Sequence, residues 1–157
     1  MIFVAVGTTD FDALVQAMDC LCPALEEEVI MQIGHGHYEP QYARFFRFAP
    51  SLRSYYESAS LVVAHGGLGI TMEVLEQGKP LVSVSNPDRY DRHQDDLLET
   101  LDAEGYLLWC RQLDQLPETI ELARQTVFAL YVKPECQIAE VIKEFLADCQ
   151  VKRPQKV

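Results

Sequence analysis

The sequence lacks the long hydrophobic run that a membrane-spanning segment needs. No stretch approaches the roughly 20 consecutive apolar residues that cross a bilayer. The opening MIFVAVG also lacks the basic residues that begin a signal peptide. We therefore expect a cytoplasmic protein with no direct membrane span, which is peripheral to a membrane only through a partner.

Positive charge is scarce as well. The 157 residues include 13 basic and 24 acidic ones, so the formal net charge is −11. Nucleic-acid binding and adhesion to anionic lipid both rest on clustered basic residues, and neither is expected here. An anionic small molecule would have to be held by local dipoles and a few cations, against the overall field.

The five cysteines form no framework. Cys20 and Cys22 make a CxC pair, but no second pair completes a zinc site. An odd number of scattered cysteines is typical of reduced thiols in a cytosolic protein. The cysteines therefore predict no zinc site. We also expect no other metal and no cofactor.

Apolar runs alternate with amphipathic segments along the chain. Strands are predicted at 2–6, 29–33, 44–48, 61–64, 80–84 and 106–110, with helices between them. This alternation predicts an α/β fold with a Rossmann-like, doubly wound parallel sheet. One domain is expected over residues 1–150, followed by a short basic tail, 151–157.

Three helix details are also predicted. Asp10 is a plausible N-cap for the first helix. The last two helices are expected over 117–130 and 135–149, each with one apolar face. The final helix is expected to pack mostly on this domain's own sheet, and it could also reinforce a contact with a partner.

A strand, a glycine-rich turn and a helix follow one another between residues 61 and 78. Glycines let the backbone approach a ligand closely, and a helix N-terminus favours an anion. The unit therefore predicts a diphosphate cradle, although a tight strand-to-helix turn without ligand is the alternative. His65 at the end of the strand and Glu73, about two helical turns later, favour the ligand site.

Three further loops are candidate walls of the same site. Gly7, Thr8 and Thr9 follow the first strand, either as hydrogen-bond donors to a ligand or as an ordinary turn with a helix cap. The loop at 34–37 is either a wall on the nucleotide side or simply exposed, because its two histidines have no evident third metal ligand. The loop at 85–94 is either a sugar-facing loop or a charged surface loop with a helix cap at Asp91.

Four motifs in this order resemble the donor-binding signature of GT-B glycosyltransferases that use UDP-sugars. They are FVAVGTT at 3–9, QIGHG at 32–36, HGG at 65–67 with Glu73 and GKP at 78–80, and DRHQ at 91–94. The closer resemblance is to the glycosyltransferase family 28 C-terminal domain. Within that family, the chain looks like the donor-binding subunits of two-chain enzymes that act on dolichol diphosphate or in bacterial exopolysaccharide synthesis. The resemblance runs from residue 2 to about residue 110.

The resemblance implies a single C-terminal-type half of a GT-B fold. It implies an inverting transfer of a sugar from a UDP-sugar to a lipid-linked acceptor, in polysaccharide or glycolipid synthesis, together with a membrane-anchored acceptor-binding partner subunit. His65 would be catalytic by stabilising the departing UDP, Glu73 would hold the ribose diol and Gln94 would contact the sugar. The implied donor-binding residues are Gly7, Thr8, Thr9, Gly34, His65, Gly66, Gly67, Gly69, Glu73, Asp91, His93 and Gln94.

Two other functions are alternatives to this one. The chain could be a non-catalytic enhancer or regulatory subunit of a partner glycosyltransferase, binding nucleotide weakly or not at all. It could also be an NAD-binding Rossmann domain, but its first strand ends in the single glycine Gly7 and no GxGxxG follows.

Overall fold

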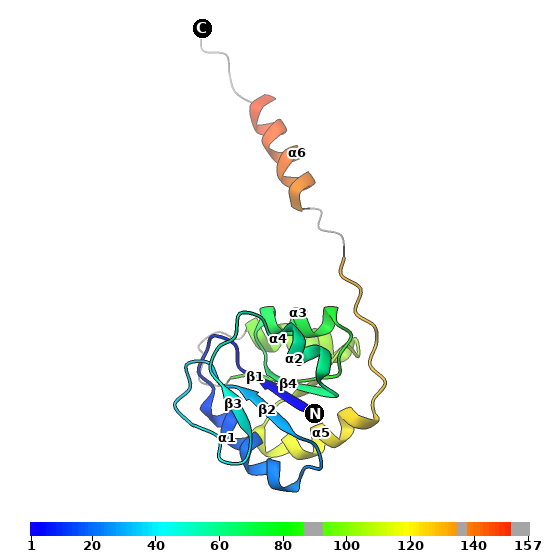
Figure 1. Ribbon diagram of the computed structural model, residues 1–157. Coiled ribbons are helices and arrows are strands. Elements are labelled where there is room, and N and C mark those ends of the chain that lie inside the picture. The colour runs from blue at the N-terminus through cyan, green and yellow to red at the C-terminus, as the bar shows by residue number, and fades with distance from the viewer. Residues whose placement is uncertain (87–92, 135–137, 152–157) are drawn as a thin grey trace.

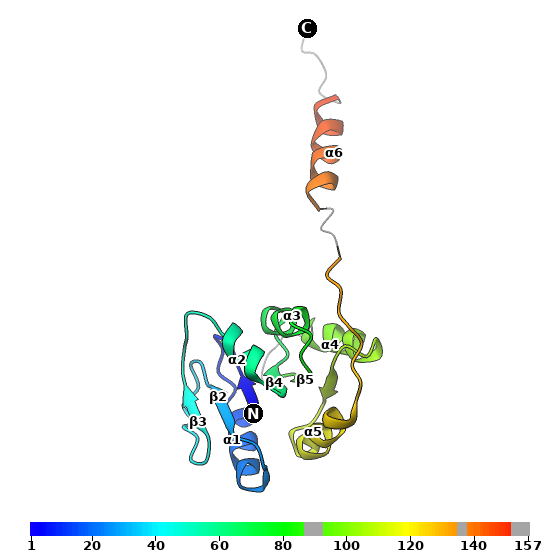
Figure 2. The ribbon, with the colours of Figure 1, turned by 45° about the vertical axis from the view of Figure 1, so that its right-hand side comes forward.

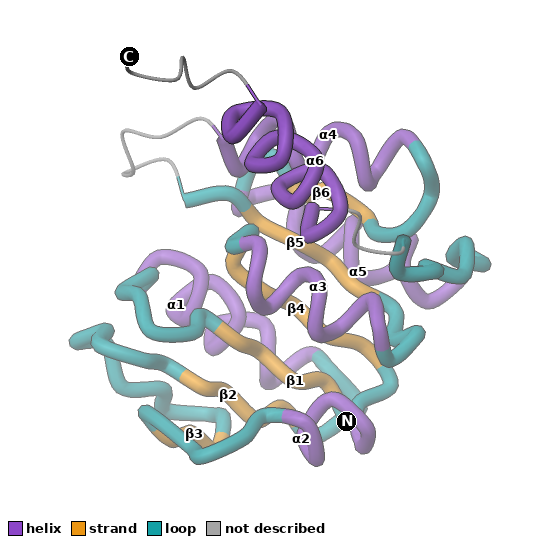
Figure 3. The backbone as a smooth tube through the Cα atoms, turned by 90° about the horizontal axis from the view of Figure 1, so that it is seen from above, coloured by secondary structure: helices purple, strands orange, loops and turns teal. Residues whose placement is uncertain are grey.

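Six parallel strands form one sheet in the order β3-β2-β1-β4-β5-β6 (Figure 3). The computed structural model describes residues 1–86, 93–134 and 138–151. The predicted sheet is confirmed, and most strands are one or two residues shorter than expected. The strands are β1 Ile2–Ala5, β2 Val29–Gln32, β3 Arg44–Phe46, β4 Leu61–His65, β5 Leu81–Val84 and β6 Leu108–Cys110.

Helices cover both faces of this sheet. In Figures 1 and 2, α2, α3 and α4 lie on one side of the strands, while α1 and α5 lie on the other. The doubly wound arrangement predicted from the sequence is therefore confirmed. The helices are α1 Asp12–Leu21, α2 Arg53–Ser58, α3 Leu68–Glu76, α4 His93–Ala103, α5 Leu116–Gln125 and α6 Ile138–Val151, with short 3₁₀ turns at Cys22–Ala24 and Leu113–Gln115.

Burial on two sides explains why the strand segments are apolar throughout. Side chains alternate between the two faces of a strand. In β1, Ile2 and Val4 pack with α1 and α5, whereas Phe3 and Ala5 pack with α2, α3 and α4. Because every position of such a strand meets a hydrophobic layer, a continuous apolar run favours it over an alternating pattern.

The strand order places a topological switch between β1 and β4. The chain moves from β1 toward β3 on one side, returns to β4, and then moves toward β6 on the other side. Loops that follow the two central strands diverge there, which leaves a crevice at their carboxyl ends. The loop after β1 begins at Val6 and Gly7, and the loop after β4 begins at Gly66.

The start of α1 differs from the prediction that Asp10 caps it. The N-cap position is occupied by Phe11, which makes no side-chain cap. The carboxylate in the first turn belongs to Asp12, and it accepts hydrogen bonds from the N–H groups of His37 at 2.9 Å and Tyr38 at 3.1 Å. Burial of the Phe11 ring, rather than a polar cap, therefore positions the helix start.

The predicted end of α5 at Leu130 is wrong, because the helix stops at Gln125. Thr126 leaves the helix in an extended conformation, with φ −84° and ψ 133°. Ala129 then donates its N–H to Gly105 O at 2.9 Å, which ties the following segment to the turn after α4. This tertiary hydrogen bond replaces the helical one that the apolar pattern predicted.

The prediction that the last helix packs on the sheet is also wrong. α6 stands apart from the sheet in both ribbon views (Figures 1 and 2). Five large apolar side chains described along α6 are 51–66% exposed, and they are Ile138, Val141, Ile142, Phe145 and Leu146. Within the described residues, no helix is both long enough and apolar enough to cross a membrane.

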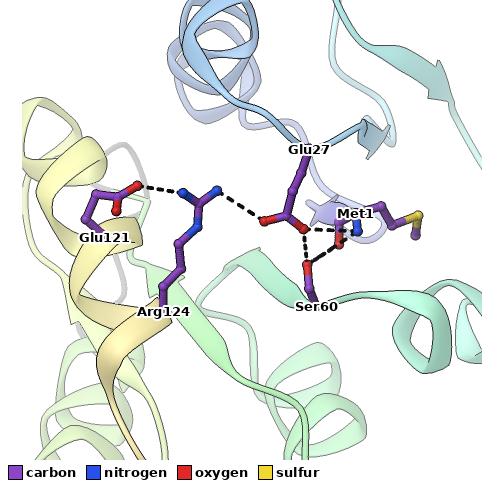
Figure 4. Close-up of polar contacts among 5 residues, drawn as sticks. All are labelled: Met1, Glu27, Ser60, Glu121 and Arg124. Carbon is purple, nitrogen blue, oxygen red and sulfur yellow. Dashed lines mark hydrogen bonds and ion pairs between the residues drawn. The ribbon is translucent and has the colours of Figure 1, made fainter.

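A polar network joins the sheet's amino edge to α5 (Figure 4). Glu27 pairs with the amino group of Met1 at 3.1 Å and with Arg124 at 3.1 Å, and it accepts a hydrogen bond from Ser60. Arg124 also pairs with Glu121 at 2.7 Å. The hydrogen bond from Ser60, followed by the nearby amino group, lowers the pKa of Glu27 although partial burial opposes this. The network thereby links the chain before β1, β2 and β4 to α5, at the end of the sheet opposite the crevice.

Buried Asp19 on α1 organises the loop between β2 and β3. Its carboxylate accepts hydrogen bonds at 2.8–3.2 Å from the Tyr38 hydroxyl and from the N–H groups of Gln41, Tyr42 and Ala43. Burial alone would raise the pKa of Asp19, but these hydrogen bonds outweigh it and the pKa is lowered. The loop therefore depends on a charged carboxylate.

We expect Asp19→Asn to lower the free energy of unfolding by about 2 kcal/mol, because an amide in place of one oxygen leaves buried donors without an acceptor. Urea unfolding at pH 7 measures the loss, with the exposed Asp114→Asn as control. Because the folded pKa lies below the ordinary 3.8, this stability is present above pH 4 and is lost as the pH falls through the folded value. Wild type and variant should therefore converge in acid; equal stability at pH 7 would contradict the prediction.

Candidate functional site

The N-terminus of α3 faces the crevice, and some of its N–H groups have no acceptor among the described residues. The N-cap is Gly67, and the first helical hydrogen bond runs from Thr71 N–H to Gly67 O at 3.1 Å. The N–H groups of Leu68, Gly69 and Ile70 therefore have no acceptor within the helix. Together with the helix dipole, these donors make a site suited to an anion.

The first two glycines of the motif do not contribute donors to that site. Gly66 donates its N–H to Val84 O at 2.8 Å, and Gly67 donates to His65 O at 2.8 Å. A Cβ on Gly66 would lie 2.6 Å from Leu98 Cδ1, and a Cβ on Gly67 would lie 2.9 Å from His65 Cε1. A side chain at either position would therefore have to displace a neighbouring side chain.

Gly69 differs from Gly66 and Gly67 because it has room for a side chain. It sits in the first turn of α3 and lines the crevice, and a Cβ built there meets no atom within 4 Å. Neither the backbone conformation nor the packing of the protein explains a glycine here. The space above Gly69 is instead open to a ligand.

The loop after β1 is held by Gln32, a residue that the sequence pattern did not single out for a role of its own. Gly7 has a φ of 71° and donates its N–H to Gln32 Oε1 at 2.7 Å. The amide nitrogen of Gln32 donates in turn to Gly7 O and Arg47 O, each at 2.7 Å. Gln32 is only 2% exposed. In the sequence, this role is indicated by a polar residue at the end of an otherwise apolar strand.

Thr8, Thr9 and Gly34 complete this loop in different ways. Thr8 is exposed and lines the crevice. The Thr9 hydroxyl donates to Val6 O at 2.8 Å. Gly34 has a φ of 55°, and a Cβ on it would lie 2.4 Å from Thr9 O and 2.6 Å from Gly7 O. Gly34 thus supports the loop from beneath and lies away from the crevice.

A cavity of about 650 Å³ occupies the crevice, within the size range of small-molecule sites. It lies between the loop after β1, the segment 49–52, α2 and one face of α3. The residues that α3 contributes recur at helical spacing, so they form a single stripe along the cavity. They are Gly69, Ile70, Glu73 and Glu76, together with the C-cap residue Gln77.

Charge is distributed unevenly along this stripe. The N–H donors at the start of α3 make one end of the cavity electropositive, while Glu73 and Glu76 place carboxylates farther along. Glu76 pairs with Lys133 at 2.7 Å, and Arg53 on the opposite wall pairs with Glu57 at 2.9 Å. The cavity is therefore suited to a ligand with an anionic group at one end and hydroxyl donors about one helical turn away.

His65 and Gln94 form a pair beside the cavity and are not among its lining residues. His65 is 4% exposed, and its ring meets Phe11 edge-on with centroids 6.3 Å apart. Gln94 Nε2 lies 3.2 Å from His65 Nε2, and this contact orients both side chains. The Gln94 Oε1 is buried and has no partner among the described residues.

The structure does not describe the side chains of two predicted site residues in the loop at 85–94. Asp91 lies outside the described residues, and so does the side chain of His93, whose backbone begins α4. The structure thus brings Gly7, Thr8, Gly69 and Glu73 into one cavity. It leaves His65, Gly66, Gly67 and Gln94 next to that cavity.

Residues 1–148 match the glycosyltransferase family 28 C-terminal domain. The Mus musculus protein named UDP-N-acetylglucosamine transferase subunit ALG13 is 38% identical over 122 residues, 69% of this chain and 10% of that protein. The Homo sapiens protein of the same name is 38% identical over 123 residues, 69% of this chain and 11% of that protein. The matched part of the chain therefore spans about a tenth of these relatives.

Solved structures with the same fold include the crystal structure of MurG from Acinetobacter baumannii. The likeness has a TM-score of 0.65 at 20% identity and covers 94% of this chain and 49% of that chain. The NMR solution structure of ALG13 gives a TM-score of 0.62 at 17% identity and covers 93% of this chain and 96% of that chain. The six-stranded sheet is thus that of the C-terminal half of MurG-like GT-B glycosyltransferases.

Alanine substitutions at Gly67 and at Gly69 are expected to have different effects on thermal stability. We expect Gly67→Ala to lower the melting temperature, because its Cβ would press on the His65 ring. Gly69→Ala should leave the melting temperature unchanged or raise it, because alanine favours a helix and its Cβ meets open space. Thermal unfolding followed by circular dichroism makes the comparison. A loss of stability in Gly69→Ala would mean that this glycine serves the fold after all.

Proposed function

The chain belongs to the glycosyltransferase family 28 C-terminal domain family, and from this premise we propose that it is the UDP-sugar donor-binding subunit of a heteromeric inverting glycosyltransferase. In this proposal the cavity along α3 holds the nucleotide. Transfer is to a lipid-linked acceptor, as in the synthesis of a polysaccharide or glycolipid. The name of the mammalian relatives makes UDP-N-acetylglucosamine the first donor to test.

The stripe along α3 carries the proposal. Gly69 and Glu73 are four residues apart, which separates them by about 6 Å along the helix axis and keeps them on the same face. A diphosphate over the free N–H groups near Gly69 would therefore bring the ribose diol to the Glu73 carboxylate. Both residues line one cavity, and the missing side chain at Gly69 allows close approach of the phosphates.

The chemistry assigned to this chain is stabilisation of the departing UDP. Negative charge grows on the diphosphate as the bond to the sugar breaks, and donors fixed before the reaction stabilise that charge without reorganising. The N-terminus of α3 supplies such donors. His65 would assist from the end of β4, and Gln94 would contact a sugar hydroxyl through its amide once a donor is bound. Asp91 and His93 remain candidate contacts to the same sugar.

A partner would supply the acceptor side of the reaction. Transfer needs a base for the acceptor proton and groups that hold the acceptor oxygen in line. We propose that a membrane-anchored chain provides both, and that it keeps this chain peripheral to the membrane. The word "subunit" in the name of the mammalian relatives and the exposed apolar face of α6 both support a heteromer.

Glu73→Ala should weaken UDP binding about 10- to 100-fold, because it removes charge-assisted hydrogen bonds worth about 1.5–3 kcal/mol. Glu76→Ala is the matched control, since Glu76 lines the same cavity but pairs with Lys133. Isothermal titration calorimetry measures both variants with UDP and with 2′-deoxy-UDP. Wild type should prefer UDP, and Glu73→Ala should bind the two nucleotides alike. No UDP binding by wild type would reject the donor site and favour a non-catalytic enhancer instead.

Gln94→Ala should distinguish binding of the sugar from binding of the nucleotide. We expect UDP affinity to stay close to that of wild type, because Gln94 lies beside the cavity and not in its wall. The additional affinity or transfer seen with UDP-N-acetylglucosamine should fall, because one sugar hydroxyl loses its partner. Competition of each nucleotide against a fluorescent UDP analogue gives both values. Equal loss for UDP and the UDP-sugar would assign Gln94 to the nucleotide.

A further inference from the structure

Tyr56 on α2 is a buried hydroxyl in the wall of the cavity. Its side chain is 0% exposed, and its ring packs edge-on against Phe3 with centroids 5.6 Å apart. The residue nevertheless lines the cavity from the side opposite α3. Among the described residues, no acceptor meets the Tyr56 hydroxyl with full hydrogen-bond geometry. A buried polar group without a partner costs about 1–3 kcal/mol, so a role beyond packing is indicated.

The charged group that acts on this hydroxyl is the Glu73 carboxylate. Burial raises the pKa of Tyr56 well above its ordinary value, and the charge of Glu73 together with hydrogen bonding to it raises the pKa further. Tyr56 therefore stays protonated at neutral pH and can only donate to Glu73. Both side chains belong to the same cavity wall, one from α2 and one from α3.

We propose that Tyr56 is a positioning residue for Glu73: its hydroxyl donates to one carboxylate oxygen and turns the other toward the ribose diol of the nucleotide. This inference rests on the proposed function. A carboxylate on an exposed helix face samples several rotamers, and binding a diol would require one of them. A donor fixed by the core selects that rotamer before the ligand arrives, which lowers the cost of binding.

The neighbouring Tyr55 provides a matched control. It lies on the same short helix and stacks on Phe3 with centroids 5.1 Å apart, but it does not line the cavity. Tyr55→Phe and Tyr56→Phe each remove one hydroxyl and keep the ring. Only the second removes a group that faces Glu73.

The test measures the preference of the full chain for UDP over 2′-deoxy-UDP by calorimetry. We expect Tyr56→Phe to reduce this preference roughly three- to tenfold, by weakening UDP and not the deoxy compound, while Tyr55→Phe leaves it unchanged. In a Glu73→Ala background, Tyr56→Phe should have no further effect on UDP affinity. A purely structural role would weaken both nucleotides alike and would persist in that background.

The outcomes separate this inference from the proposed function. If wild type binds UDP and Glu73→Ala abolishes the ribose preference, but Tyr56→Phe retains it, the positioning role is wrong and the donor site stands. If wild type does not bind UDP, both fail. If Tyr56→Phe does not fold, the hydroxyl is structural and the positioning role is rejected.

Discussion

The buried amide of Gln32 is the interaction on which the site depends. It bonds both backbone groups of Gly7 and also reaches Arg47 O, so it ties the end of β2 to the loop after β1 and to the segment after β3. The carboxyl ends of these three strands are thereby kept in register on one side of the switch point. The loop that faces the start of α3 is thus positioned before any ligand arrives. A hydrophobic residue at position 32 would fit the strand pattern but would remove the partner of both backbone groups of Gly7, while Arg47 O would keep only its hydrogen bond from Gly34 N–H at 3.2 Å.

The distribution of charge explains how an acidic chain can provide an anion site. The formal net charge of −11 sets an unfavourable overall field, but the start of α3 supplies N–H donors at short range. Interactions over a few ångströms in a partly closed cavity outweigh distant surface charges, which salt screens within about 8 Å. The acidic groups that line the cavity, Glu73 and Glu76, lie beyond the first turn of α3. They therefore suit hydroxyl donors better than phosphate.

Much of the fold followed from the sequence because local patterns determine it. Two-sided burial makes the strands continuous apolar runs, so their existence and parallel arrangement were predicted correctly. The errors arose where a distant partner decides the outcome. The end of α5 is set by a hydrogen bond from Ala129 to Gly105, and the start of α1 by burial of Phe11. For the site, the grouping of Gly7, Gly69 and Glu73 was predictable from motif order. Gln32 stands out in the sequence as a polar residue ending an apolar strand, but only its contacts show what its amide holds.

The glycine motif shows why sequence patterns give a site only in outline. Three glycines near the end of β4 look alike in the sequence, yet two of them lie against neighbouring side chains of the fold. Gly66 makes room for Leu98, and Gly67 makes room for His65. Only Gly69 faces open space in the cavity. Since folding does not require this third glycine, it is the position where selection for a ligand can be separated from selection for the fold. The physical case for a diphosphate over α3 therefore rests on Gly69 and on the free donors around it, more than on the number of glycines in the motif.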